Sequence, residues 1–197
     1  MDWVTTTSIL EGLADFGNPV AWGRLTDRFR APIVAFAVRM GVREPEAEDI
    51  AQETLLAFAE GYRKGGYDLG KGHLGDWLFG IAYRQLLKMR ERLARREAQA
   101  PRGGTATSFW AKIPDEKDAT TSWDEEWARA VLSQCLQQVR KELEPSTVQA
   151  FEMFALVRRP ADEVASQLGI SRGAVYVAKH RVLNRLRELK EQYEQVA

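Results

Sequence analysis

The chain has 197 residues, of which 45% are hydrophobic and 28% are charged. This composition is typical of a folded globular protein, and no apolar run approaches the roughly 20 residues that a membrane-spanning helix needs. The first residues, MDWVTTTS, lack the basic and then apolar pattern of a secretion signal, so we expect a cytoplasmic protein. One cysteine, Cys135, excludes an internal disulfide, and with two scattered histidines it predicts no metal site and no cofactor.

The formal net charge of zero conceals an alternation of sign along the chain. Residues 1–60 carry 5 basic and 10 acidic residues (net −5), and residues 61–102 carry 10 and 4 (net +6). Residues 103–145 carry 5 and 8 (net −3), and residues 146–197 carry 8 and 6 (net +2). Basic surface attracts nucleic acid, whereas acidic surface favours a different partner. The pattern therefore predicts two separate contacts with DNA and an acidic surface for something else.

The N-terminal part begins with a short polar stretch, residues 1–18, which we expect to be a loosely attached arm. Apolar residues at helical spacing then predict a helix over residues 19–40. Pro32 lies inside it and is expected to kink or split it. A turn follows, and Pro45 marks the start of the next helix.

The helix predicted over residues 45–62 has two distinct faces. Its buried stripe is Ile50, Ala51, Leu55 and Phe58. A second face combines acidic and amide side chains with one apolar residue: Asp49, Gln52, Glu53 and Leu56. Such a face suits a protein partner, although an ordinary solvated helix face has the same composition.

A glycine-rich basic loop, residues 63–75 (RKGGYDLGKGHLG), comes next. It nearly matches a phosphate-binding P-loop, but glycine stands at position 72, where that motif needs serine or threonine to hold magnesium. A helix also precedes the loop where the motif needs a strand. The loop is better interpreted as a segment that grips exposed bases or phosphates through donors and Tyr67; the alternative is a plain connector.

The helix predicted over residues 77–96, with Asp76 as its cap, is strongly basic. Its buried stripe is Leu78, Ile81, Ala82, Leu86 and Met89. Its other faces carry Arg84, Lys88, Arg90, Arg92, Arg95 and Arg96, with Trp77 and Tyr83 near its start. Aromatic residues beside a basic loop and a basic helix favour contact with nucleic acid over a merely solvated face.

Residues 97–122 lose this periodicity and are rich in Pro, Gly, Ser and Thr, which predicts a linker. Phe109 and Trp110 interrupt it, and their role is left open. Further helices are predicted over residues 123–143 and 145–157. They would cover the last part of the chain and complete a second, four-helix domain over residues 123–197.

Residues 160–190 carry the pattern of a helix-turn-helix. A short helix over residues 161–168 is followed by Gly169, which suits a left-handed helix end, and by Ser171, which caps a longer helix. Val175, Ala178, Val182 and Leu186 form the buried stripe of that helix. Its other face could meet phosphates and base edges in a major groove; the alternative is a helical hairpin with a solvated basic face.

The fold predicted from these elements is all-α: an arm (1–18), a helical domain (19–96), a linker (97–122) and a helix-turn-helix domain (123–197). In this order the parts resemble bacterial extracytoplasmic-function (ECF) sigma factors of RNA polymerase. AEDIAQETLLAFAEGYRK (47–64) resembles the family's polymerase-binding helix, and GHLGDWLFGIAYRQLLKMRERLARR (72–96) its −10-reading segment. PADEVASQLGISRGAVYVAKHRVLNRLREL (160–189) resembles its −35-reading unit.

The resemblance implies a role for each candidate residue. Core RNA polymerase would be bound by Glu48, Asp49, Gln52, Glu53 and Leu56. The −10 element of promoter DNA would be bound by Lys64, Tyr67, Lys71, His73, Trp77, Arg84 and Lys88. The −35 element would be bound by Ser171, Arg172, Tyr176, Val177, His180, Arg181 and Arg185. The linker would thread toward the RNA exit path.

Two other classes of function stay open: a helix-turn-helix regulator that binds DNA without polymerase, and a sigma-like protein-interaction module. An enzyme is not expected, because no paired carboxylates, nucleophile triad or metal cluster stands out. The controller is left open between an anti-sigma protein and a kinase that acts on the Thr5–Ser8 run. No membrane insertion is expected.

Overall fold

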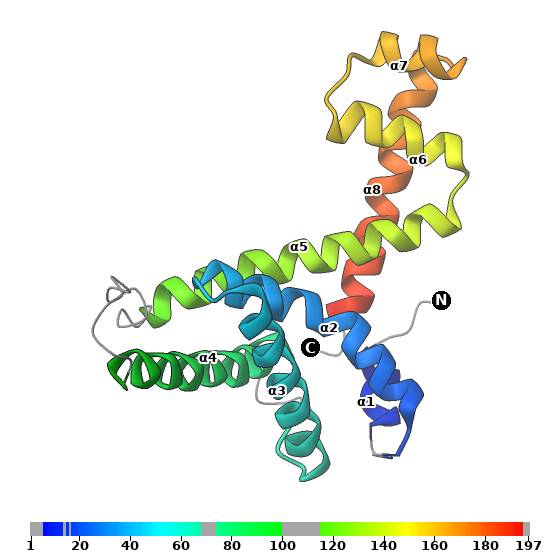
Figure 1. The fold of residues 1–197 in the computed structure, drawn as a ribbon. Coiled ribbons are helices and arrows are strands. Elements are labelled where there is room, and N and C mark those ends of the chain that lie inside the picture. Colours follow the sequence, from blue (N-terminus) through cyan, green and yellow to red (C-terminus); the bar gives the residue numbers. More distant parts are fainter. Residues whose placement is uncertain (1–5, 14, 16, 68–73, 100–114, 195–197) are drawn as a thin grey trace. The chain divides into compact units, whose positions relative to one another are not determined.

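The computed structural model describes residues 6–13, 15, 17–67, 74–99 and 115–194. Within these ranges the chain is built from helices and contains no strand (Figure 1), so the predicted all-α class is confirmed. None of these helices is long and apolar enough to cross a membrane. Contacts group the described residues up to Ala130 into one compact unit and those from Val131 onward into a second.

The N-terminal unit contains α1 (Thr6–Gly12), α2 (Pro19–Arg39), α3 (Glu44–Arg63), α4 (Leu74–Gln99) and the first part of α5 (Glu116–Glu142). Helix α2 begins where the Asn18 side chain accepts hydrogen bonds from the backbone N–H groups of Val20 and Ala21. It continues without a break through the buried Pro32. Helices α2 and α3 match the predicted ranges to within one residue at each end.

The core of this unit is formed by the stripes that the sequence predicted. Helices α2, α3 and α4 pack together, and their largest fully buried side chains include Phe29, Phe36, Phe58, Ile50, Leu78 and Leu86. Helix α4 begins at Leu74, so Asp76 lies in its first turn and the prediction that it is the cap is wrong. A carboxylate there still interacts favourably with the positive end of the helix.

The N-terminal segment is not the loosely attached arm that its polar start predicts. Residues from Thr6 form α1, which packs against α2, and Ile9, Leu10 and Leu13 are at most 3% exposed. Three fully buried aliphatic side chains are worth several kcal/mol of transfer free energy, which is enough to hold one short helix in place. The polar Thr-rich start concealed this apolar cluster.

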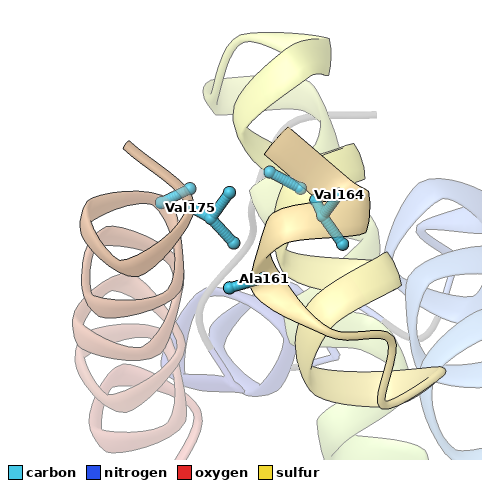
Figure 2. Close-up of a cluster of buried hydrophobic side chains, with 5 residues drawn as sticks. Ala161, Val164 and Val175 are labelled. Carbon is cyan, nitrogen blue, oxygen red and sulfur yellow. The ribbon is translucent and has the colours of Figure 1, made fainter. Parts of the chain in front are cut away.

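The C-terminal unit contains the rest of α5, α6 (Pro145–Phe151), a π-helical turn η2 (Glu152–Leu156), α7 (Ala161–Leu168) and α8 (Arg172–Glu194). The helix predicted over residues 145–157 thus starts at Pro145, but its last turn is π-helical. A small apolar cluster joins these helices: Ala150, Ala161, Val164, Val175 and Ala178. Figure 2 shows Ala161 and Val164 of α7 facing Val175 of α8.

The connection between α7 and α8 follows the predicted pattern. Gly169 ends α7 with φ = 65°, a left-handed conformation that glycine adopts without strain. The Ser171 hydroxyl accepts a hydrogen bond from the backbone N–H of Ala174 over 3.1 Å and so caps α8. The predicted stripe of Val175, Ala178, Val182 and Leu186 is buried.

The predicted boundary between linker and second domain differs from the structure. Helix α4 extends to Gln99, and α5 begins at Glu116, seven residues before the predicted start at Trp123. The division between the two units falls inside α5, after Ala130. Periodicity alone could not show this, because one continuous stripe of α5 supplies buried residues to both units: Ala119 and Trp123 to the first, Val131, Cys135 and Val139 to the second.

Candidate functional site

The acidic face predicted on α3 is largely solvent-accessible. Ile50, Ala51, Leu55 and Phe58 are buried against the rest of the unit, which turns Asp49, Gln52 and Glu53 outward. Leu56 is 44% exposed and adds apolar area to this face. In the described part of the chain neither Asp49 nor Glu53 forms an ion pair, whereas Glu48 pairs with Arg30 of α2. The five predicted residues thus share one surface of α3.

Two grooves flank this face. One, of about 450 Å³, lies between α3 and α4 and is lined by Asp49, Gln52 and Glu53 on one side and by Gln85, Lys88 and Arg92 on the other. The second, of about 430 Å³, lies between α2 and α3, where Trp22, Thr26 and Arg30 face Leu55 and Leu56. Asp49 and Gln52 line both grooves. The face is thus an acidic ridge between two grooves, one charged and one partly apolar.

The sequence did not predict that α2 contributes to this surface. Trp22 of α2 is half-buried and lines the second groove. Arg30 was not singled out at all. Its exposed position on α2, at the edge of the stripe that contains Phe29 and Ile33, is a signal that could have found it.

Four aromatic residues surround the start of α4. Trp77 stacks on Tyr67, with ring centroids 5.0 Å apart and ring planes 11° from parallel, and it also contacts Phe58 at 5.0 Å. Tyr62 lies 6.4 Å from Tyr67. Burial is the main reason why the pKa of the Tyr67 phenol is raised. The structure therefore brings together Tyr67 and Trp77, two of the residues predicted to contact the −10 element, as one stacked pair.

Two glycines make room for this aromatic cluster. A Cβ on Gly61 would lie 3.0 Å from the Trp77 indole, and one on Gly66 would lie 3.0 Å from the Gly61 carbonyl oxygen. Neither position tolerates a side chain without movement of its neighbours. The backbone at Gly61 and Gly66 therefore lies close to the Trp77 ring.

The remaining residues of the predicted −10 set are distributed around this cluster. Lys64 ends α3 and is exposed, and Arg84 and Lys88 are exposed on α4. Lys71 and His73 lie outside the described residues, as do Phe109 and Trp110. Arg90, predicted to lie on the basic surface, is instead 7% exposed and donates a hydrogen bond to the Met40 carbonyl at the end of α2. Burial lowers the pKa of its guanidinium.

In the C-terminal unit the predicted −35 residues lie on the first turns of α8. Ser171, Arg172, Tyr176, Val177, His180 and Arg181 are all exposed, and Val177 is 65% exposed although it is apolar. Arg172 lies 3.6 Å from Asp162, and the Tyr176 ring packs edge-on against Phe154. The predicted residues at the start of α8 are therefore solvent-accessible, and Val177 is an exposed apolar side chain among them.

Arg185 differs from the other residues predicted to contact the −35 element. Its guanidinium donates to both carboxylate oxygens of Glu142, over 2.6 and 3.1 Å, and to Glu188 over 2.8 Å. The side chain is 29% exposed. Arg185 therefore joins parts of its own unit through two carboxylates. Any contact of Arg185 with DNA would have to compete with these partners.

Comparison with known families assigns the middle of the N-terminal unit. Residues 25–96 match the family model for sigma-70 region 2. The match begins within α2, includes all of α3 with its acidic face, and ends within α4. None of the curated proteins matches this chain. Residues 25–96 are thus similar to sigma-70 region 2, which agrees with the resemblance noted in the sequence for this part of the chain.

Proposed function

We propose that the protein is a promoter-specificity (sigma) factor of the extracytoplasmic-function type. It would bind core RNA polymerase and direct transcription initiation at promoters with −10 and −35 elements. The observation that carries the proposal is the region 2 match over residues 25–96, combined with a solvent-accessible acidic face on α3 inside the matched segment. The protein would act by binding and positioning, without a catalytic step of its own.

The contact with polymerase is assigned to α3 and its two grooves. Asp49 and Glu53 lie one helical turn apart and are free of intramolecular ion pairs in the described structure, so a basic partner surface can pair with them. The exposed Leu56 adds apolar area at the end of the ridge. Isolated surface charges contribute little, but a row of carboxylates beside an apolar anchor gives both attraction and orientation.

The contact with the −10 element is assigned to the aromatic cluster and the neighbouring basic face of α4. Holding DNA open requires that unstacked bases find new stacking partners, and a base stacked on an aromatic side chain gains about 1–3 kcal/mol. Tyr67 and Trp77 are half-buried aromatic residues beside exposed Lys64, with Arg84 and Lys88 further along α4. Aromatic rings beside cationic side chains suit single-stranded DNA, because its bases can stack on the rings and its phosphates can pair with the cations.

The contact with the −35 element is assigned to the start of α8. Arg172 and His180 offer donors to base edges or phosphates, and Val177 offers apolar contact of the kind that a thymine methyl group accepts. The Gly169 turn ends α7 and the Ser171 cap begins α8, so the exposed Arg172 stands at the start of α8. The same features would serve a regulator that binds DNA on its own, which is the second candidate function.

The test is transcription in vitro with purified core polymerase on a library of promoter fragments. A sigma factor yields transcripts that start at discrete positions only when the protein is added, and it co-purifies with core polymerase. A stand-alone regulator binds DNA without polymerase, commonly as a dimer on a palindromic site, and yields no start sites. The absence of protein-dependent start sites across the library would contradict the proposal.

A further inference from the structure

Arg172, at the start of α8, has a neighbour on each of two helices of the C-terminal unit. Its Nε atom lies 3.6 Å from a carboxylate oxygen of Asp162, which stands in the first turn of α7. Tyr176 lies one helical turn further along α8, at the spacing at which side chains of one helix meet. A hydrogen bond with Tyr176 and, after it, the charge of Asp162 raise the pKa of the Arg172 guanidinium. The guanidinium is therefore flanked by a phenol and by a carboxylate.

Tyr176 is held in turn by Phe154 of the π-helical turn η2. The two rings pack edge-on, with centroids 5.2 Å apart and planes 77° apart. Phe154 packs against the buried apolar cluster of the unit, and the Lys179 ammonium lies 5.5 Å from the centroid of its ring. Edge-on aromatic packing and cation–π contact favour one arrangement of these side chains over others. The core of the unit thus sets the position of Tyr176, although this residue is 40% exposed.

Arg172 stays accessible to a ligand in spite of these neighbours. Its side chain is 64% exposed, whereas that of Arg185 is 29% exposed and donates to two carboxylates. The separation between Asp162 and Nε exceeds that of an ordinary hydrogen bond, and a guanidinium has more N–H donors than one phenol oxygen can accept from. Asp162 and Tyr176 can therefore orient Arg172 and still leave it donors for DNA.

A fixed orientation matters for the kind of contact that arginine makes with DNA. Arginine reads guanine in the major groove by donating to two acceptors at once, which requires a defined direction of the guanidinium plane. A long side chain that must be ordered on binding loses about 2- to 12-fold in affinity. An arginine that is already ordered before binding avoids this loss, and only at the base that its direction matches.

From these contacts we infer that Asp162 and Tyr176 are positioning residues, which hold the Arg172 guanidinium in the direction in which it reads one base pair of the −35 element. Guanine is the base that such an arginine reads most often. This inference rests on the proposed contact between α8 and the −35 element. Asp162 also has a purely local role, because a carboxylate in the first turn of a helix stabilises that helix. Glu163 shares this local role, but of the two only Asp162 pairs with Arg172 in the described part of the chain.

The experiment measures base discrimination by the full-length protein. The wild-type protein first selects its preferred duplex from a randomised library, and fluorescence anisotropy then gives the Kd for this duplex and for each of its single-base variants. The substitutions are Asp162→Asn and Tyr176→Phe, each alone and each combined with Arg172→Ala. Tyr176→Phe removes the hydroxyl and keeps the ring against Phe154. Glu163→Gln is the matched control, because it removes the same charge from the same turn of α7.

The quantity compared is the ratio of Kd values between a substituted and the preferred base pair, at the position where Arg172→Ala lowers this ratio. Asp162→Asn and Tyr176→Phe should each lower it about threefold or more, because Arg172 loses its fixed direction. Glu163→Gln should change it by less than about 1.5-fold, even if the lost negative charge raises the affinity for every duplex. Combined with Arg172→Ala, neither substitution should change the ratio by more than about 1.5-fold, because the guanidinium that they orient is absent.

Ratios that stay at the wild-type value in both single variants would overturn the inference and leave the sigma-factor function standing. A change in only one of them would overturn the positioning role of the other residue. Equal losses with and without Arg172 would also overturn the inference, because Asp162 and Tyr176 would then act on DNA independently of Arg172. If the wild-type protein selects no sequence at all, the proposed −35 contact fails, and the inference fails with it.

Discussion

The Arg185 guanidinium joins two helices of the C-terminal unit by donating to both oxygens of the Glu142 carboxylate, 43 residues earlier in the chain. Glu142 ends α5 and Arg185 lies in the second half of α8, so the pair fixes the end of one helix against the middle of the other. The hydrogen bonds from Arg185 are the main reason why the pKa of the Glu142 carboxyl lies below its usual range.

This lowered pKa predicts how the stability of the protein depends on pH. A carboxyl group whose pKa is depressed by folding stabilises the native state above its unfolded pKa of about 4.3, and this contribution is lost as the pH falls through the lower, folded value. Near the surface the contribution should be about 1 kcal/mol. Glu142→Gln should therefore lower the free energy of unfolding by about that amount at pH 6 and by much less near pH 3.

Urea denaturation of both proteins at the two pH values measures the difference. Glu163→Gln, at an exposed position on α7, is the matched control and should change the free energy of unfolding by less than about 0.5 kcal/mol at either pH. If Glu142→Gln lowers the free energy of unfolding equally at pH 3 and pH 6, the charge of the Glu142 carboxylate does not stabilise the fold.

Gly61 of α3 predicts an unusual response to alanine. Inside a helix, alanine is normally more stabilising than glycine by about 0.8–1 kcal/mol. A Cβ on Gly61, however, would stand 3.0 Å from the Trp77 indole, which Phe58 and Tyr67 hold from other sides. We expect Gly61→Ala to destabilise the protein by about 1 kcal/mol.

Gly23 of α2 supplies the control for this prediction, because a Cβ there would meet nothing within 4 Å. Gly23→Ala should stabilise the protein by about 0.5–1 kcal/mol. Thermal denaturation distinguishes the two, with midpoints that move in opposite directions. Stabilisation by both substitutions would show that the Trp77 side chain moves easily to make room for a methyl group at position 61.

Arg172 and Arg185 should differ in what they contribute to DNA binding. Arg172 is exposed in the first turn of α8, where base-edge contact is usual, so Arg172→Ala should weaken binding to the preferred −35 duplex about tenfold and relax discrimination at one base pair. Arg185 is held by Glu142 and Glu188. Arg185→Ala should lower thermal stability and leave the ranking of −35 variants unchanged.

Fluorescence anisotropy with a set of single-base −35 variants, measured below the melting transition of both proteins, tests this difference. If both substitutions weaken every duplex by the same factor, Arg172 contacts backbone rather than bases. If Arg185→Ala changes the ranking of the variants, Arg185 reaches a base edge in spite of its intramolecular partners.

The sequence predicted best where structure is determined locally. Gly169 and Ser171 each act on their own neighbours, so the end of α7 and the start of α8 could be located from the residues alone. Helices α2, α3 and α4 followed from apolar periodicity for the same reason.

The sequence predicted less well which contacts form between residues that are distant along the chain. The helical pattern around Trp123 and Trp127 does not show that the rings they contact are Phe36 and Phe29. The sequence places Arg90 among exposed basic residues, but its side chain is buried and donates a hydrogen bond to the Met40 carbonyl. Such contacts depend on tertiary packing, which no local pattern contains.

The affinity for core RNA polymerase tests the proposal that the acidic face of α3 binds it. The measurement is the Kd of the full-length protein for purified core polymerase, compared with Asp49→Lys combined with Glu53→Lys. Glu11→Lys combined with Asp27→Lys is the matched control, because it changes the same charge at exposed positions away from both grooves. With circular dichroism unchanged, we predict at least a hundredfold loss of affinity for the first variant and less than a threefold loss for the control. Equal affinities for all three proteins would show that the acidic face of α3 does not bind core RNA polymerase.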